Sequence, residues 1–446
     1  MSDSPQSTQR PTLLRVLGLV FGLAVVIGGM IGSGIMRAPG VVAQGITSGP
    51  LTLAVWALLG GMAMLTAMPL VEAGSSLPIA GGAYAIADRA FGRATGIFAG
   101  WLSWLQLTAS NAFISVVFGE YVHRLGFAAG LSTGVLAVGL IIAVGGINWI
   151  GTRVSGASQS LASAIKGAAF VVLAAILFAS PHAATPVVPP SAHLAGLTTL
   201  GAFVMAIRVI YQTYAGWDTG IMFSEEVSRP EKNVARSTFW GIGLVTVLYV
   251  VMNAAVLHVL NPSAIAGSAL AVGDAVKVSL GPVGDTVITA IGLFSLSAIV
   301  NLQTMGAARI TFGMARDGVL PTALAKVAKG GAPRRSVLAV TLVAALFAAT
   351  GSYEGIVRIY APWSMGAILV ICICAIRLRI IEPELARPWR MPLFPWIAIL
   401  ACAVQAGLIG VVMWDDPRAA LLSILVGFAP LLVMSIWWLF TNLRRA

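Results

Sequence analysis

Charged residues are scarce in this chain of 446 residues: they make up 10% of the sequence, whereas 58% of it is hydrophobic. A soluble domain carries about 25% charged residues. The composition therefore excludes an ordinary soluble protein and predicts an all-α membrane protein that crosses the bilayer many times. About twelve spans of roughly twenty residues each would use the whole chain, which leaves no room for a soluble catalytic domain.

Cysteine and histidine are also rare, with three and four copies. Cys372, Cys374 and Cys402 lie in apolar runs, so nothing indicates a disulfide framework or a metal site. The histidines are scattered over expected loops and outer helix ends, at His123, His182, His193 and His258. Because no nucleophile set or carboxylate pair gathers near one face, a membrane enzyme is the weaker hypothesis. We expect no metal and no cofactor.

Acidic residues are fewer than basic ones, 16 against 27, which gives a net charge of +11. In a membrane protein basic residues collect on the cytoplasmic side, so this excess does not indicate nucleic-acid binding. Alternating spans from a cytoplasmic N-terminus leave few basic residues in the expected outer segments: Arg124, Lys277, Arg358 and Arg418. This asymmetry predicts an even number of spans in the plasma (inner) membrane, with both termini cytoplasmic.

The apolar run 13–42 is interrupted near its middle by four glycines and a serine within the seven residues 28–34. Glycine costs about 1 kcal/mol in a helix interior, so these residues predict an unwound segment at 29–34. Unpaired backbone at bilayer depth is tolerated only where it is buried in protein or lines a polar cavity. Free N–H groups at the start of the second half-helix would suit an anion. The alternative is a face of small residues that packs against another helix.

A second interruption, Tyr214 to Asp218, lies in the sixth expected helix. Interrupted first and sixth helices predict an inverted-repeat transporter whose breaks meet near the midplane. Residues 1–12 would be a cytoplasmic tail, 13–180 the first five-helix repeat, 195–378 the inverted second repeat, and 379–446 helices 11 and 12 with the cytoplasmic C-terminus. The expected helices are about 13–45, 50–75, 95–122, 131–149, 156–179, 198–227, 237–260, 285–315, 335–351, 355–377, 393–413 and 418–440.

Several short motifs follow one another in a characteristic order. They are Gly32-Ser33-Gly34-Ile35, Glu72, Gly81-Gly82-Ala83-Tyr84, Phe91-Gly92, Ala215-Gly216-Trp217, Glu225-Glu226-Val227-Ser228-Arg229-Pro230, Ala315-Arg316-Asp317-Gly318-Val319-Leu320-Pro321 and Glu382-Pro383-Glu384-Leu385-Ala386-Arg387-Pro388. Together they resemble the amino acid–polyamine–organocation (APC) superfamily. Within it, the chain looks nearest the L-amino-acid transporter (LAT) branch and its bacterial relatives, over about residues 13–440.

This resemblance implies that an amino acid binds where the two breaks meet. Its carboxylate would lie on the unwound backbone of the first break, and its amino group would meet carbonyls of both breaks. A zwitterion needs donors at one end and acceptors at the other, as broken helices provide. The expected substrate-binding residues are Met30, Ile31, Gly32, Ser33, Gly34, Tyr211, Gln212, Tyr214, Ala215, Gly216, Trp217 and Asp218.

The chain departs from the family pattern at several positions. Gln212 stands where an aromatic gate residue is common, with Tyr211 and Tyr214 as substitutes beside it. Ala215 stands where many relatives carry glycine. Asp218 stands where the LAT branch usually has a neutral amide. The loop between the third and fourth expected helices has no cysteine, so we expect no disulfide-linked heavy subunit.

Charged residues inside expected spans are functional hypotheses by default. Lys166 matches the lysine that takes the place of a sodium ion in sodium-independent relatives, and Ser295 is its expected hydroxyl partner. The alternative is a lysine that snorkels to the inner interface. Arg37 and Arg208 also lie in spans, in a vestibule or in structural ion pairs. Glu225 and Glu226 are expected in a solvated inner cluster with Arg229 or Arg309.

These observations favour a secondary transporter that moves small amino acids by alternating access, without sodium, as an exchanger or a proton-linked symporter. Asp218 keeps open a cationic amino acid or polyamine antiporter. An amino acid receptor that does not transport is the alternative from another class, although no soluble output domain is expected. The partners are the substrate and the lipid bilayer, with no nucleic acid, and the protein would be a monomer or a homodimer.

Overall fold

The computed structural model describes residues 13, 15, 17–32, 34–182, 199–268, 270–350, 353–415, 417–418, 420–429 and 432. Within this part the regular elements are helices, and Leu17 and Val227 form an isolated parallel bridge. Eight of the described helices are long and apolar enough to cross a membrane, and α1 with α2 makes a ninth if the bent pair is one span. The protein is therefore an all-helical membrane protein with many spans.

The described helices follow the expected order. They are α1 (Leu19–Met30), α2 (Gly34–Gly45), α3 (Gly49–Ser76), α4 (Ala83–Phe91), α5 (Arg93–Arg124), α6 (Thr133–Ile150), α7 (Thr152–Ala179), α8 (Thr199–Thr213), η2 (Trp217–Phe223), α9 (Pro230–Val259), α10 (Pro262–Ile265), α11 (Ala271–Leu280), α12 (Pro282–Arg316), η3 (Thr322–Ala325), α13 (Arg334–Ala349), α14 (Tyr353–Ile381), α15 (Trp396–Asp415) and a further stretch, Ala420–Ala429.

The three expected spans beyond these nine are shorter or incompletely described. The sixth expected helix is divided into α8, with 15 residues, and η2. The ninth is α13, with 16 residues, and most of 430–440 lies outside the described residues. Two expected starts were several residues late, because α9 begins at Pro230 and α12 at Pro282. Proline suits a first turn, where its missing N–H has no partner to lose.

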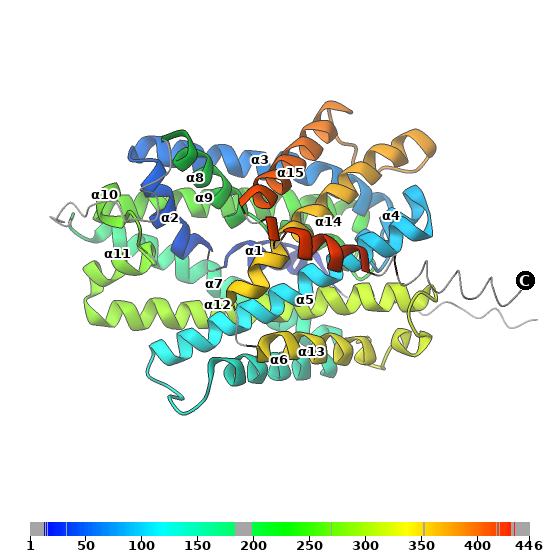
Figure 1. Ribbon diagram of the computed structural model, residues 1–446, viewed down its shortest axis with the longest axis horizontal. Coiled ribbons are helices and arrows are strands. Elements are labelled where there is room, and N and C mark those ends of the chain that lie inside the picture. The colour runs from blue at the N-terminus through cyan, green and yellow to red at the C-terminus, as the bar shows by residue number, and fades with distance from the viewer. Residues whose placement is uncertain are drawn as a thin grey trace, which may run out of the picture.

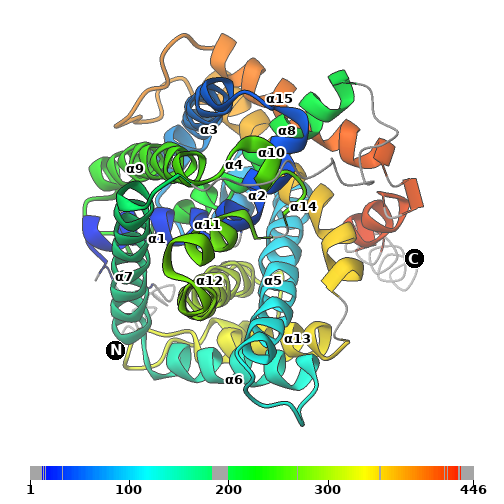
Figure 2. The same cartoon turned by 90° about the vertical axis from the view of Figure 1, so that its left-hand side faces the viewer.

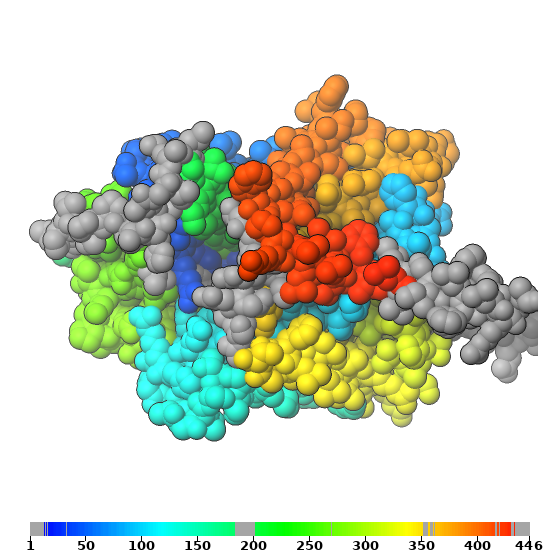
Figure 3. Space-filling view, viewed as in Figure 1, coloured from blue at the N-terminus to red at the C-terminus, as the bar shows by residue number. Residues whose placement is uncertain are grey.

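Figure 1 shows the long helices running roughly side by side, with α4 at one end of the bundle and α10 and α11 at the other. We call these the α4 end and the α11 end. Viewed along the bundle, α12 lies near the centre, with α7 and α9 on one side and α6 and α13 on another (Figure 2). On the face in Figure 3, the stretch Ala420–Ala429 lies between α15 and α13. Because α12 packs against α1, α5 and α7, both halves of the chain share one core.

The two interrupted helices touch at their breaks. The first bends by 43° between Met30 and Gly34, and the second leaves the α-helix after Thr213. Gly216 has a φ of +109°, and a Cβ there would lie 2.5 Å from the Gly29 carbonyl oxygen. Only glycine combines this backbone conformation with so close an approach of another chain segment. The breaks predicted from the sequence are therefore present and lie against each other.

Two ion pairs with buried carboxylates lie at the α4 end. Glu226 accepts from Arg309, 2.7 Å from Nε to Oε2, and both side chains are buried. Glu225 accepts from Arg316 and from the backbone N–H groups of Leu13 and Ala80. The expected pairing with Arg309 is confirmed, but the expectation that the cluster is solvated was wrong. These carboxylates join separate chain segments and satisfy buried donors.

Candidate functional site

A cavity of about 150 Å³ lies where the two breaks meet. Residues of and next to the two breaks line one part of it, and residues of α5, α12 and α14 line the rest. The lining residues of the breaks are Gly29, Met30, Gly32, Gly34, Gln212, Thr213, Ala215, Gly216, Asp218 and Thr219. Those of the other helices are Gln106, Leu107, Ser110, Phe113, Ile114, Leu296, Ile299, Gln303 and Tyr360.

Most of the substrate-binding residues expected from the sequence line this cavity. They are Met30, Gly32, Gly34, Gln212, Ala215, Gly216 and Asp218. The cavity lining does not include Ile31, Tyr211, Tyr214 or Trp217. Ser33 lies outside the described residues.

The two tyrosines next to Gln212 have partners on the far side of their helix. The Tyr211 hydroxyl lies 3.1 Å from Thr66 Oγ1 and accepts from Gln405 Nε2 at 2.8 Å. The Tyr214 hydroxyl donates to the Trp56 carbonyl at 2.9 Å. Neighbouring positions on an α-helix are turned by about 100° from each other. Gln212 and Thr213 line the cavity, whereas the hydroxyls of Tyr211 and Tyr214 reach partners on other helices.

Tyr249 of α9 joins the two breaks, and the sequence analysis missed it. Its hydroxyl lies 2.7 Å from the Met30 carbonyl and 3.3 Å from the Thr213 carbonyl. It is fully buried and packs against Tyr214. A buried hydroxyl needs a hydrogen-bond partner, so a tyrosine within an apolar helix indicated a buried hydrogen bond. The sequence did not indicate which group accepts it.

Lys166 of α7 is directed at the end of α1. Its Nζ donates to the carbonyls of Gly28 at 3.0 Å and Ile31 at 2.6 Å. The Ser295 hydroxyl donates to the same Ile31 carbonyl at 3.2 Å. Carbonyls at the end of a helix lack intrahelical partners, and the ammonium supplies donors for two of them. With 1% exposure, Lys166 does not snorkel to an interface.

Neutral polar groups and one carboxylate line the α5 side of the cavity. Gln106 Nε2 lies 3.4 Å from Asp218 Oδ2, and Gln303 Nε2 donates to the Ser110 hydroxyl at 2.9 Å. Gln303 Oε1 is buried without a partner in the described part of the chain. No lysine or arginine of the described ranges lines the cavity. Asp218 is therefore the one charged group among the described lining residues.

Apolar side chains complete the cavity. Phe113 and Tyr360 meet edge to face, with ring centroids 5.1 Å apart. Ile114 and Ile299 contribute aliphatic surface. These residues come from three separate helices, and no local motif in the sequence connects them.

Several known proteins are similar to this chain over most of its length. The family model described as amino acid permease matches residues 17–438. The serine/threonine exchanger SteT of Bacillus subtilis is 26% identical over 436 residues, 95% of this chain and 97% of the relative. The mouse b(0,+)-type amino acid transporter 1 is 27% identical, covering 89% and 83% of the two chains. The methylthioribose transporter of Bacillus subtilis is 26% identical, covering 96% and 93%.

Proposed function

The chain belongs to the amino acid permease family, and on this premise we propose that it carries small neutral amino acids across the plasma membrane without sodium, as an exchanger or a proton-linked symporter. As a member of this family it is an amino acid transporter and not an enzyme. The observation that carries the proposal is the cavity at the contact of the two breaks. A relative named as a serine/threonine exchanger favours exchange of small polar substrates.

The substrate backbone is assigned to the two breaks. The carboxylate would meet Gly32, Ser33 and Gly34, near the N-terminus of α2, where N–H groups and the helix dipole favour an anion. The amino group would meet the carbonyls of Met30 and of the second break. Tyr249 uses one lone pair of the Met30 oxygen, and a carbonyl oxygen has two.

The substrate side chain is assigned to the wall formed by α5 and α12. Gln106, Ser110 and Gln303 offer neutral hydrogen-bonding groups there. A cavity of about 150 Å³ is below the roughly 300–1,000 Å³ of sites for drug-sized ligands. Both features support a small substrate, polar or apolar, rather than a large aromatic one.

A cationic amino acid or a polyamine is the second candidate substrate, with antiport as the mechanism. Asp218 lines the cavity, is 5% exposed and has no basic partner among the described lining residues. A buried carboxylate is stabilised by a nearby positive charge. A cationic substrate would supply that charge.

We also propose the complete architecture. The division of α1 from α2 and of α8 from η2 supports twelve spans, with 13–180 and 195–378 as inverted repeats. The α4 end would face the cytoplasm with both termini, because arginines such as Arg93, Arg153 and Arg335 gather there. Lys166, with Ser295, would take the place of a coupling sodium ion at the end of α1.

Flux through proteoliposomes tests the proposal. Vesicles loaded with serine should take up labelled serine, threonine or alanine when sodium is absent, whereas amides without the carboxylate should not compete. Gly34→Val should abolish this uptake, because a Cβ at Gly34 already lies 3.1 Å from Thr213. Gly61→Val is the matched control, since a Cβ there has nothing within 4 Å.

Three results would contradict the proposal. Amides that compete as well as the parent amino acids would refute the carboxylate assignment. Preference for arginine or a diamine would select the second candidate. Binding detected by thermal shift, with no flux under any gradient, would indicate a receptor.

A further inference from the structure

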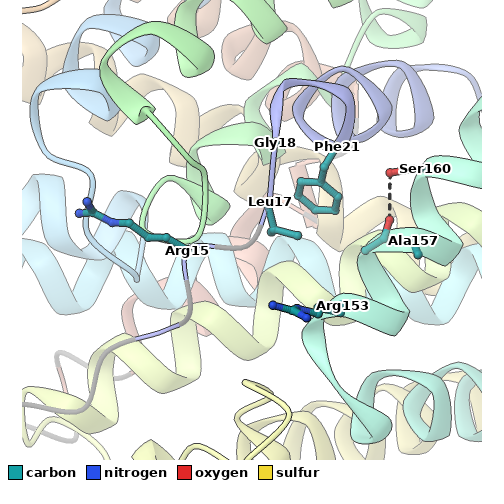
Figure 4. A pocket seen from close by; sticks show the side chains of 8 residues that line it. Arg15, Leu17, Gly18, Phe21, Arg153, Ala157 and Ser160 are labelled. Carbon is teal, nitrogen blue, oxygen red and sulfur yellow. Dashed lines mark hydrogen bonds between the residues drawn. The ribbon is translucent and has the colours of Figure 1, made fainter.

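A hollow of about 410 Å³ lies at the α4 end, between the segment that leads into α1 and the first turns of α7. Arg15 and Arg153 line it together with Phe21 and Ser160. In Figure 4 the Arg153 side chain lies below Leu17 and Phe21, whereas Arg15 lies to the left of Leu17 with its side chain extending away from the other labelled residues. The charged lining of this hollow is therefore purely basic.

Neither arginine is neutralised within the described part of the chain. Arg15 and Arg153 are exposed, and neither forms a hydrogen bond or ion pair there. Among the described residues that line the hollow there is no carboxylate. Residues 1–12 carry one acid, Asp3, and one base, Arg10, so that segment has no excess of negative charge to offer. An anion from outside the chain fits this charge distribution.

A second hollow, of about 440 Å³ and almost wholly apolar, lies further along the same helices. Ile27 of α1, Ile31 directly after its end, Gly167 and Val171 of α7, and Leu248 of α9 line it. In Figure 2, α7 and α9 form one side of the bundle beside α1. A bilayer presents hydrocarbon to such a surface.

The two hollows share one face of α7. Ala157 and Ser160 line the first and Gly167 and Val171 the second, with Ala164 between them. This spacing of three and four residues keeps small side chains on one side of the helix. From Ala157 to Val171 the face extends about 21 Å, at about 1.5 Å per residue. Half of the hydrocarbon core is about 15 Å thick. Val20 and Leu161, which adjoin the lining residues Phe21 and Ser160 in the sequence, are 73% and 64% exposed.

We propose that the two hollows, joined along this face of α7, together form a groove that binds one anionic phospholipid. Its phosphate lies at Arg153, with Arg15 swinging in from the chain, and an acyl chain occupies the apolar hollow beside Ile27 and Ile31. Basic pockets between membrane helices with an apolar continuation match this chemistry. The Ile31 carbonyl also receives Lys166 and Ser295, so the lipid contacts the residue at which α1 breaks. This site is separate from the amino acid cavity and does not depend on the substrate assignment.

Native mass spectrometry of the full-length protein tests the site. The protein is titrated with phosphatidylglycerol and with phosphatidylcholine of the same acyl chains, and inorganic phosphate is added as a competitor. An arginine near a lipid surface contributes about fivefold in affinity, so the double variant Arg15→Gln/Arg153→Gln should bind phosphatidylglycerol roughly 25-fold more weakly. Its matched control is Arg335→Gln/Lys326→Gln, because these residues are also exposed at the α4 end.

A second variant addresses the acyl chain. A Cβ at Gly167 has nothing within 4 Å, so Gly167→Leu should fit the fold and fill the apolar hollow. It should weaken both lipids at this site, while Gly146→Leu, at an equally open position of α6, should not. Equal affinity of the unmodified protein for both lipids would overturn the proposal, as would a Gly167→Leu variant that binds like the control. Inorganic phosphate displacing the lipid at equal concentration would show a simple anion site instead.

Discussion

Replacement of Lys166 by alanine is the most informative perturbation of the region where α1 breaks. The ammonium donates to the Gly28 and Ile31 carbonyls and is 1% exposed. In the alanine variant the Ile31 carbonyl keeps the Ser295 hydroxyl. The Gly28 carbonyl loses its charged donor in a buried place. The change therefore acts on the end of α1, and Lys166 itself does not line the amino acid cavity.

The size of the effect follows from the two lost hydrogen bonds. A hydrogen bond to a charged group contributes about 1.5–3 kcal/mol. Two of them give roughly 3 kcal/mol at the lower limit. Every 1.4 kcal/mol is tenfold in an equilibrium constant, so the arrangement of α1 in which Lys166 holds its end should be disfavoured by about 100-fold. Because the substrate contacts remain, turnover should fall by about this factor while the apparent substrate affinity changes much less.

The assay is uptake into proteoliposomes with sodium or choline as the only added cation. The unmodified protein should transport equally well in both. Lys166→Ala should be slow in both, whereas Lys277→Ala, at an exposed position of α11, should behave like the unmodified protein. Uptake by the unmodified protein that collapses in choline would refute the idea that Lys166 takes the place of sodium. A Lys166→Ala variant with normal turnover would refute the assigned role of its hydrogen bonds.

Three further predictions concern other parts of the molecule. Gly216→Ala should abolish uptake and lower the melting temperature, because φ is +109° and the Cβ would lie 2.5 Å from the carbonyl oxygen of Gly29 in the other break. Gly220→Ala should do neither, because the atom nearest to its Cβ would be 3.8 Å away. If the Asp218 carboxylate contacts the substrate, Asp218→Asn should weaken the binding of cationic substrates by roughly ten- to a hundredfold and that of neutral ones little. Equal losses of affinity for both classes in competition assays would show that it does not. The hydrogen bond from Arg89 lowers the pKa of Glu382, so this pair stabilises the fold at neutral pH. That stabilisation is lost as the pH falls through the pKa of Glu382 in the folded protein. Since Arg89 is 58% exposed, solvent screening limits the gain to at most about 1 kcal/mol; melting curves of Arg89→Gln should show slightly less acid sensitivity, and unchanged sensitivity would contradict the pair's contribution.

Composition and local propensity predicted the membrane class and both breaks. Lipid offers no hydrogen-bond partners to the backbone, so a single chain satisfies its backbone there with long apolar helices, and each such run is visible locally in the sequence. Glycines clustered at 28–34 weaken the helix where they stand, and α1 ends at Met30 in agreement with the prediction. The family resemblance added the expectation that Lys166 and Ser295 act together, and the two side chains donate to one carbonyl.

The direction of each side chain at the site was decided by tertiary packing. Gln212 faces the cavity, whereas Tyr211 contacts Thr66 and Gln405. The sequence marked the whole segment as important but not which face of its last turn is turned inward. That depends on how α8 is rotated against its neighbours, and a rotation of about 100° exchanges adjacent residues.

Tertiary packing also decided which distant segments contact each other. Tyr249 reaches the Met30 carbonyl across 219 positions, and nothing in the sequence indicated this contact. The sequence offered Arg229 and Arg309 as partners of Glu226, and the structure pairs it with Arg309, 83 positions away. The sequence shows that each of these side chains needs a hydrogen-bonding or charged partner when it is buried. It does not show which of several suitable partners along the chain this will be. Only the packing of α1, α9, α12 and η2 brings one of them within hydrogen-bonding distance, and that packing is a property of all the helices together.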